Sequence, residues 1–561
     1  MRNNSLRQPA SGLLLCALGL PVTALAVTPP DAGQTLQQLQ SAPPPSAPVT
    51  PAPTLSNEVQ PAESGPADNS QKVHVARLTF QGNSIYDSAR LSQIAHIENA
   101  DVSLAELRAA AHRVSEYYRG HGYLVARAYL PAQDISAGVV TIAVLEGRLD
   151  SATVHNQSQV SDHWLQSVLA AQLPANAPIK GDAANRALML LQQTPGIAGV
   201  QAALRPGTAV GTTALDVDVK GGPKVSGSVT ADNYGSTFTG KGRLSGALNA
   251  ANLTGIGDQL SVQGLIAEHD GLDFGRLAWD LPVGHDGARV GAALSNSDYK
   301  LGHDFASLDA HGHVRTASLY GSYPLWLAPT THVNSGLSLE QRRLTDITGA
   351  TDFTSHKTTQ AGVLTFSGDF ADQALLTPAT SAWRLSQTLG DLDLRTPSTQ
   401  AIDAASARTA GHYAKTVLSL SREQSLINNL SLYLAGSAQY SNKNLDSSEQ
   451  FFLGGPNGIR AYPQGEASGD QGWQGTLELR YAVISHLQLI AFHDAGMIEI
   501  NRQPYIAQPN GRHLSGSGAG FNTGWGAFSL KASVAWRGGS DAPTSDKDRR
   551  PQVWVQGNYS F

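Results

Sequence analysis

The sequence predicts a mainly β protein, in which a transmembrane antiparallel β-barrel of about 16 strands follows two small α/β domains. Three observations predict this fold. A secretory signal begins the chain, one α/β pattern occurs twice over residues 72–222, and apolar and polar residues alternate over residues 223–561. Charged residues make up only 15% of the 561 residues, where a soluble domain carries roughly 25%, so the composition also favours a membrane protein.

Residues 1–26 are organised as a secretory signal peptide. A positively charged start precedes a short apolar run, residues 12–20, and Ala24 and Ala26 frame a small-x-small cleavage site. The run is too short for a transmembrane helix, which needs roughly 20 residues. We expect cleavage after Ala26, which also removes Cys16, the one cysteine of the chain. Since no later apolar stretch is long enough for a transmembrane helix, any membrane-spanning part must be a barrel.

A short helical segment and a Pro-rich linker follow the signal. Residues 27–40 contain a polar helix candidate that starts at Asp31, after two prolines. Residues 41–71 hold eight prolines among Ala and Ser, a composition typical of an extended, semi-rigid linker. A helix on such a tether is free to dock elsewhere in the molecule or to move.

Residues 72–148 and 149–222 repeat one order of strands and helices. In the first unit, Ser103 is placed to cap a helix whose apolar residues keep a helical spacing, and Gly120 ends that helix. The second unit repeats the pattern with its own pair of helices and strands. Two tandem copies of one small α/β unit favour a recognition arm over a single catalytic domain.

From residue 223 onward the helical period disappears and strict alternation begins. One segment shows it clearly, with apolar residues at odd positions and polar residues at even positions: Thr476, Leu477, Glu478, Leu479, Arg480 and Tyr481. Segments of about ten residues with one apolar and one polar face are typical of a transmembrane barrel with a wet lumen. The chain ends on such a strand, with Tyr559 and Phe561 on its apolar face, the form expected of bacterial outer-membrane barrels.

Three motifs in the barrel region carry a resemblance to a known family. Residues 231–262 look like a first barrel hairpin, and residues 447–481 look like a long sixth extracellular loop with the strand that follows. Phe492, Asp494 and Gly496 are similar to a Phe-x-Asp-x-Gly strand motif. Together, in this order and spacing, they resemble the TpsB-type transporters of two-partner secretion, which export haemolysins and filamentous haemagglutinins. The resemblance covers nearly all of the chain after the linker.

The resemblance implies the roles of the other segments. It implies that residues 72–148 and 149–222 are POTRA domains in the periplasm, and that the helix within residues 27–40 plugs the resting pore. It also implies that a loop at about residues 445–474 folds back into the barrel lumen.

The same resemblance implies a contact between the tip of this loop and the barrel wall. The tip has these residues where the family has Val-Arg-Gly-Tyr: Ile459, Arg460, Ala461 and Tyr462. In the family, the Arg of the tip meets the strand Asp, here Asp494. Strand parity alone places Asp494 on the lumen face, and an Arg–carboxylate pair is directional, so it could pin the loop. If the tip needs a positive φ where the family has Gly, Ala461 would cost about 1 kcal/mol.

The expected function is protein export. By resemblance, we expect an outer-membrane transporter that recognises a large, unfolded exoprotein in the periplasm through its POTRA domains. It would secrete this TpsA-type partner, which carries an N-terminal secretion domain, without nucleotide, and the partner could be a haemolysin or an adhesin that is activated in the process. Further expected partners are outer-membrane lipid and, during biogenesis, the barrel-assembly machinery, with Phe561 and Tyr559 as the C-terminal assembly signal.

Other classes of function have less support. We find no catalytic constellation, and we expect no cofactor and no metal. Nucleic acid is not an expected partner, because the net charge of −6 provides no basic field to attract it. Two alternatives stay open. One is a barrel-assembly insertase, and the other is a porin-like nutrient channel.

Overall fold

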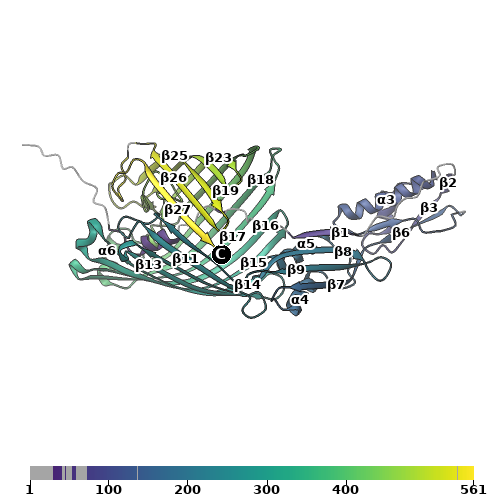
Figure 1. The fold of residues 1–561 in the computed structure, drawn as a ribbon, viewed down its shortest axis with the longest axis horizontal. Helices are drawn as coiled ribbons and strands as arrows, with labels where there is room; N and C mark the ends of the chain where they lie inside the picture. The colour runs from purple at the N-terminus through teal and green to yellow at the C-terminus, as the bar shows by residue number, and fades with distance from the viewer. Residues whose placement is uncertain (1–28, 41–44, 46–52, 59–71, 136, 540) are drawn as a thin grey trace, which may run out of the picture.

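The computed structural model describes residues 29–40, 45, 53–58, 72–135, 137–539 and 541–561. The chain forms a β-barrel from which an arm of two small α/β domains extends to one side (Figure 1). This confirms the predicted fold class. The expected signal peptide and most of the expected linker lie outside the described residues. In the described part of the chain, no helix is both long enough and apolar enough to cross a membrane.

Sixteen antiparallel strands close into one barrel, which confirms the predicted strand number. Each barrel strand pairs with the next, and β10 (Val225–Asp232) pairs with β27 (Gln552–Ser560) to close the ring. The fourteen strands between them are β11 (Arg243–Ala251), β12 (Gln259–Ala267), β13 (Leu272–Val283), β14 (Ala288–Lys300), β15 (Ala310–Ala328), β16 (Thr331–Thr348), β17 (Phe353–Asp372), β18 (Ala379–Leu394), β19 (Gly411–Ile427), β20 (Leu430–Ser441), β23 (Gln471–Ile484), β24 (Leu487–Glu499), β25 (Gly511–Trp525) and β26 (Phe528–Arg537).

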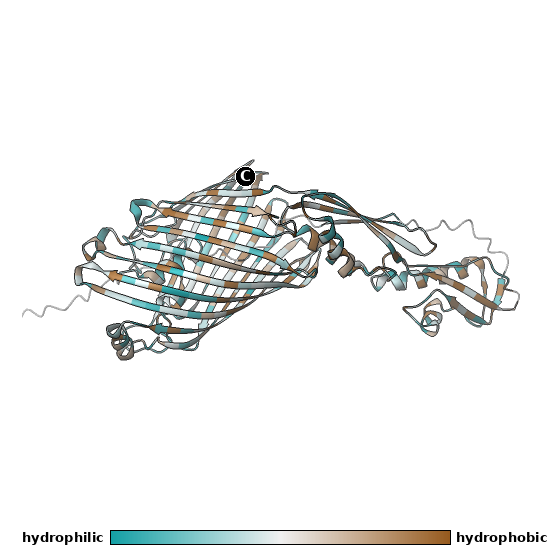
Figure 2. Ribbon diagram, turned by 90° about the horizontal axis from the view of Figure 1, so that it is seen from below, coloured by the Kyte–Doolittle hydropathy of each residue, from teal (hydrophilic) through white to brown (hydrophobic). Residues whose placement is uncertain are grey.

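The two faces of the barrel wall carry opposite kinds of side chain. On β23, Leu477 and Leu479 are 45% and 43% exposed, whereas Glu478 between them is only 6% exposed. Figure 2 shows apolar and polar residues alternating along the barrel strands. Because successive side chains of a strand point to opposite faces, the apolar set forms the outer surface that meets lipid, and the polar set lines the lumen.

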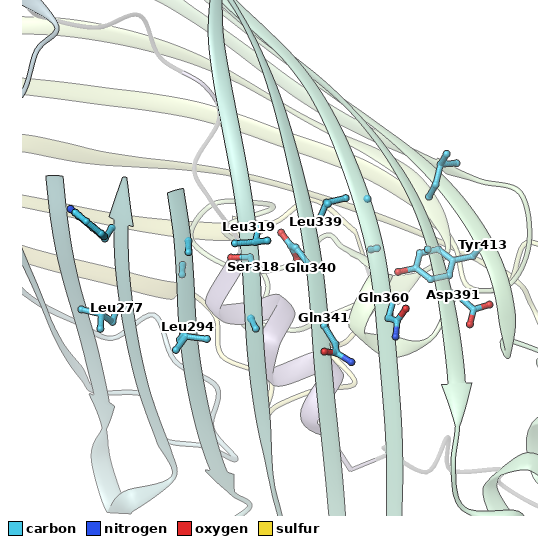
Figure 3. A pocket seen from close by; sticks show the side chains of 18 of the residues that line it. Leu277, Leu294, Ser318, Leu319, Leu339, Glu340, Gln341, Gln360, Asp391 and Tyr413 are labelled. Atoms are coloured by element: carbon cyan, nitrogen blue, oxygen red, sulfur yellow. The ribbon is translucent and has the colours of Figure 1, made fainter. Parts of the chain in front are cut away.

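An apolar hollow lies on the wall over β13 to β19 (Figure 3). Leu319 and Leu339 face each other across β15 and β16 and are 63% and 55% exposed. The adjacent pair, Ser318 and Glu340, lies on the opposite side of the wall because of the strand alternation. We therefore interpret the apolar side of this hollow as lipid-facing surface.

The first α/β domain packs two helices against short strands. Its elements are β2 (Lys72–Val75), β3 (Arg77–Gln81), α2 (Ser88–Ala95), β4 (Ala100–Ser103), α3 (Leu104–Gly120), β5 (Arg127–Tyr129) and β6 (Val139–Leu145). Ser103 caps α3 reciprocally with Glu106, because each side chain accepts a hydrogen bond from the other residue's backbone N–H.

Glu146 is a buried acid at the end of this domain. Its carboxylate accepts hydrogen bonds from the backbone and hydroxyl of Ser84, from the N–H of Ile85 and from the hydroxyl of Tyr118. Burial alone would raise the pKa of Glu146, but these hydrogen bonds outweigh burial and hold it below the usual value of 4.5.

The second α/β domain connects the arm to the barrel. Its elements are β7 (Arg148–Gln157), α4 (Asp162–Gln172), α5 (Gly181–Gln192), β8 (Ile197–Pro206) and β9 (Thr212–Gly221). Helix α5 lies against β15, where Arg186 donates a hydrogen bond to the carbonyl of Pro324 at 3.0 Å. Leu327 of β15 joins the apolar core of this domain.

The structure adds short secondary-structure elements where the sequence pattern does not predict them. Within the expected linker, β1 (Thr54–Asn57) pairs with the sheet of the second α/β domain. Beyond residue 223, where no helix is expected, α6 (Pro397–Ala405) lies between β18 and β19, so that expectation is wrong. The nine residues of α6, with proline in the first turn, are too few to establish a visible helical period. Short 3-10 helices are η1 (Glu268–Asp270), η2 (His303–Leu308), η3 (Gly349–Thr351) and η4 (Ser447–Glu449).

Candidate functional site: the loop and helix inside the barrel

The chain between β20 and β23 folds back into the barrel. This loop, residues 442–470, contains η4 and a small hairpin of β21 (Phe451–Phe452) and β22 (Ser468–Gly469). Its tip residues have exposures of 0, 9, 2 and 1% for Ile459, Arg460, Ala461 and Tyr462. Three of them share an apolar cluster with lumen-facing residues of β24 and β25, so the tip packs against the inside of the wall.

Arg460 makes a two-pronged ion pair with Asp494 of β24. The Nε and Nη2 atoms of Arg460 lie 2.9 and 2.7 Å from Oδ2 and Oδ1 of Asp494. The backbone N–H of Arg460 donates to the same carboxylate at 3.1 Å. Asp494 has no exposed surface. A buried, charge-assisted pair of this kind is strongly directional, so it holds the loop tip in one orientation.

Other side chains complete the surroundings of Arg460. Its Nη1 atom lies 2.6 Å from Oε1 of Glu478, and its Nη2 atom lies 2.8 Å from the hydroxyl of Thr476. The ring centre of Phe492 lies 3.4 Å from the guanidinium carbon, and the indole N–H of Trp554 donates to the Arg460 carbonyl at 2.8 Å. Of these four residues, only Phe492 belongs to a motif that could be assigned from the sequence. Thr476 and Glu478 lie on the polar face of β23, so the alternation pattern could have indicated them as lumen residues. Trp554 lies 94 residues from Arg460 along the chain, and no local sequence pattern connects the two.

Small residues make room for the tip. A Cβ atom at Gly496 would lie 2.7 Å from the carbonyl oxygen of Trp473 and 3.1 Å from Cδ1 of Ile459, so a larger residue would push the tip away. The backbone φ of Ala461 is not positive. Alanine in place of the family's glycine therefore causes no backbone strain at this position. Its methyl group lies over Gly516, where an added Cβ would come within 2.3 Å of it.

A second buried acid holds the descending part of the loop. The carboxylate of Glu466 is fully buried and pairs with Arg512 of β25. It also accepts hydrogen bonds from the backbone N–H groups of Thr544 and Ser545, at 3.0 and 2.8 Å, in the loop before β27. Glu449 of the loop also pairs with Arg342 of β16 and Lys415 of β19, so the loop is attached to the wall at several separate carboxylates.

Helix α1 (Ala32–Gln40) lies inside the barrel, against β14, β15, β16 and η4. Ala32 and Leu36 join an apolar cluster with lumen-facing residues of those strands. An added Cβ at Gly33 would lie 2.3 Å from the hydroxyl of Ser447, so the helix meets the loop at a glycine. The helix and the loop thus occupy the lumen in direct contact.

A cluster of charges joins α1 to both the wall and the loop. The Nζ atom of Lys357 on β17 lies 3.2 Å from Asp31 and 3.0 Å from Asp446. The hydroxyl of Ser447 donates to Asp31 at 2.6 Å, and Asp346 of β16 accepts the first N–H of the helix at 2.7 Å. Lys357 is only 8% exposed, and its ammonium group is the cation that Asp31 of the helix segment and Asp446 of the loop share.

The C-terminal residues lie at the seam of the barrel. Phe561 exchanges two backbone hydrogen bonds of 2.9 Å with Gly227 of β10. The rings of Tyr559 and Phe561 stack with centres 6.0 Å apart and are 38% and 54% exposed. Among the described residues, no group of three or more His, Cys, Asp or Glu side chains is placed to hold a metal ion.

Comparisons with known proteins agree with this architecture. The sequence profile of the family "Haemolysin secretion/activation protein ShlB/FhaC/HecB" matches residues 211–523, and that of the ShlB-type POTRA domain matches residues 73–147. The heme/hemopexin transporter protein HuxB of Haemophilus influenzae is 27% identical, over 82% of this chain and 83% of its own length. The outer membrane transporter CdiB of Dickeya dadantii is 24% identical over 77% of each chain.

A solved structure has the same fold. The structure of CdiB from Escherichia coli covers 94% of this chain and 98% of its own, with a TM-score of 0.73 and 20% identity. The family profile spans more than half of the chain and covers most of the barrel, including all three motifs. The chain therefore belongs to the ShlB/FhaC/HecB family of haemolysin secretion/activation proteins, the TpsB transporters of two-partner secretion, with its barrel in the bacterial outer membrane and its POTRA domains in the periplasm.

Proposed function

We propose that this transporter receives one unfolded exoprotein at two POTRA domains, residues 72–148 and 149–222, and passes it through the barrel lumen without nucleotide. The observation that carries the proposal is the position of α1, a short helix packed inside the lumen, which supports the role of a removable plug. Two relatives are named a heme/hemopexin transporter and an outer membrane transporter, which supports a transport role for this chain as well.

The contacts of α1 suit a plug that leaves and returns. Its principal buried apolar side chain, Leu36, contributes roughly 1.5–3 kcal/mol by burial. Ala32 and Leu39 add smaller apolar contacts in the same cluster, and the other contacts are ionic and polar, so water in a wet lumen can replace them. Removal of the helix therefore costs an amount that binding of an exoprotein can supply. Folding of the exoprotein outside the cell would then make its passage one-way, with no catalytic step.

We assign Arg460 and Asp494 as positioning residues of the sixth loop. Their pair holds the tip on the wall of β23 and β24, so that the loop leaves a defined path beside α1. Phe561 and Tyr559 are assigned to recognition by the barrel-assembly machinery, because they end the last strand with exposed rings at the seam. The outward leucines are assigned to contact with outer-membrane lipid.

Mass spectrometry of the culture supernatant tests the proposal. The host is compared with a deletion strain and with a deletion strain that carries the wild-type chain. We expect one large protein with an N-terminal secretion domain to disappear on deletion and to return with the wild-type chain. An unchanged supernatant, combined with depletion of several outer-membrane barrels, would instead assign the chain as an insertase.

A further inference from the structure

Two arginines lie side by side on the outer face of the barrel wall. Arg315 of β15 is paired directly with Arg343 of β16, and both side chains are exposed. Each lies four residues from an outward leucine of its own strand, Leu319 or Leu339, so parity places both arginines on the same outer face. Directly paired side chains have Cβ atoms about 4.5–5.5 Å apart, and like charges at this separation repel each other.

The described part of the chain supplies no counterion to this pair, because neither guanidinium forms an ion pair there. Asp273 and Asp298 face each other on β13 and β14, one row of paired residues further from the POTRA domains, and Asp298 accepts a hydrogen bond from Asn296. By contrast Arg342, on the lumen face, pairs with Glu449 at 2.8 Å. An anion from outside the chain would therefore relieve the repulsion between the two outer arginines.

The arginine pair borders an apolar groove on the outer wall. The groove has a volume of about 800 Å³, and one row of paired side chains lines its apolar part: Val262, Leu277 and Leu294. It adjoins the apolar hollow of Figure 3, with which it shares Leu277 and Leu294. The next row toward the extracellular side contains Arg315 and Arg343. An apolar surface and a double positive charge thus meet within one groove.

Side-chain amides complete the polar end of this groove. Asn296 lies directly opposite Arg315, and Gln341 lies two residues before Arg343 on the same strand face. An amide group both donates and accepts hydrogen bonds, so it suits the hydroxyl groups of a sugar. Guanidinium groups bind phosphate through two parallel hydrogen bonds.

The height of the arginines in the wall places them at the outer edge of the membrane. Trp326, which is 56% exposed, lies on the outer face near the end of β15 that adjoins the second POTRA domain. Arg315 precedes it by eleven residues, roughly 36 Å along the strand. At a strand tilt of about 35–45°, the rise is roughly 25–30 Å, and the apolar band of such a barrel is about 25 Å tall. The arginines therefore lie at the level of the lipid headgroups on the extracellular side.

Elsewhere on the barrel, aromatic rings occupy this level. The extracellular ends of β20, β23 and β26 carry Tyr440, Trp473 and Trp536, which are 57, 49 and 50% exposed. Such rings are typical of the interface belt of a membrane barrel. The paired arginines on β15 and β16 are a local departure from that belt, so they indicate a specific contact.

We propose that this groove binds one molecule of the phosphorylated glycolipid of the outer leaflet, lipopolysaccharide. Arg315 and Arg343 hold a phosphate group, Asn296 and Gln341 contact the sugar that carries it, and an acyl chain lies on Leu277 and Leu294. The charge favours a phosphate-bearing lipid, and the amides favour a glycolipid over a phospholipid. This site goes beyond the proposed transport function, because it concerns the lipid face of the wall and not the lumen.

Native mass spectrometry of the purified full-length chain in detergent tests the proposal. The probes are bisphosphorylated lipid A, which is the membrane anchor of lipopolysaccharide, its dephosphorylated counterpart, and phosphatidylglycerol. The buffer contains EDTA, so a metal ion cannot bridge a phosphate to Asp273 and Asp298. The apparent Kd is measured for wild type and for Arg315→Gln with Arg343→Gln. A matched control is Arg384→Gln with Lys531→Gln, which removes two positive charges from the lumen face.

We expect wild type to bind the bisphosphorylated lipid at least about tenfold more tightly than either other probe, because only this lipid offers both phosphate and sugar. The outer double variant should lose at least about tenfold in affinity, and the lumen control should stay within about twofold of wild type. Heat-modifiable gel migration confirms that each barrel is folded.

Three results would each overturn the inference. They are an outer double variant that binds within about twofold of wild type, equal binding of the dephosphorylated lipid, and equal binding of phosphatidylglycerol. The comparison among the three lipids uses wild type alone, so it decides the matter even where the double variant does not fold. None of these results bears on the transport function, which the supernatant assay tests separately.

Discussion

Replacing Arg460 with alanine is expected to undock the tip of the sixth loop while the barrel still forms. The side chain holds two carboxylates, Asp494 with no exposed surface and Glu478 at 6% exposure. Without the guanidinium, Asp494 stays on the wall without its cation, Glu478 keeps only Arg480, and the tip loses its directional contact. Barrel closure does not depend on this residue, since the β10–β27 seam is made by backbone pairing elsewhere.

The size of the effect follows from this burial. Removing one partner of a buried ion pair costs about 3–5 kcal/mol, because the remaining charge is left uncompensated. At about 1.4 kcal/mol per factor of ten, the docked-to-undocked ratio of the tip should fall by roughly a hundred- to several-thousand-fold. Arg395→Ala is a matched control, because Arg395 and its partner Asp393 are 58% and 54% exposed. Its expected effect is at most about 1 kcal/mol.

Thiol labelling of the loop tip measures this ratio. Ile459→Cys introduces a probe at a position with no exposed surface when the tip is docked. The maleimide reaction rate of the purified protein is compared with and without Arg460→Ala, and secretion is measured in parallel. We expect faster labelling and blocked secretion, with a normal amount of inserted barrel. Slow labelling equal to wild type, or normal secretion, would refute the reasoning that this pair positions the loop.

Three further predictions concern other parts of the molecule. Lys357→Ala removes the hub between α1 and the wall, so planar-bilayer recordings should show a larger open fraction; an unchanged fraction would show that the cluster does not hold the plug. Gly496→Leu should block docking of the tip and abolish secretion, because even a Cβ there would lie 3.0 Å from Leu453 and 3.1 Å from Ile459 of the loop; normal supernatant levels would disprove this steric role. Glu146→Gln should destabilise the first POTRA domain by about 1–3 kcal/mol, seen as faster amide exchange in the full-length protein. Since the folded-state pKa of Glu146 is lowered, its stabilising effect is present above the usual 4.5 and is lost as the pH falls through the folded-state value, so the difference between wild type and variant should shrink in acid.

Much of the architecture could be predicted because its physical causes are local. Alternation along a strand decides which side chains can face lipid, and the length of the alternating region, at roughly 21 residues per strand and loop, predicted the observed strand number. The cap of α3 depends on Ser103 and Glu106, which are three residues apart. The lumen-facing side of Asp494 likewise follows from parity within one strand.

The tertiary structure decided what those faces meet. Trp554 reaches the carbonyl of Arg460 across 94 residues, and Glu466 reaches Thr544 across 78, so neither contact has a local pattern. The composition of residues 41–71 predicts an extended segment but not its partner, because any extended chain can add to an open strand edge. The sequence by itself thus determined the barrel, the arm and the orientation of the wall residues. Only closure of the barrel decided which charges pair inside it, and only the position of the POTRA sheet decided where β1 binds, because both depend on segments that meet in space and not along the chain.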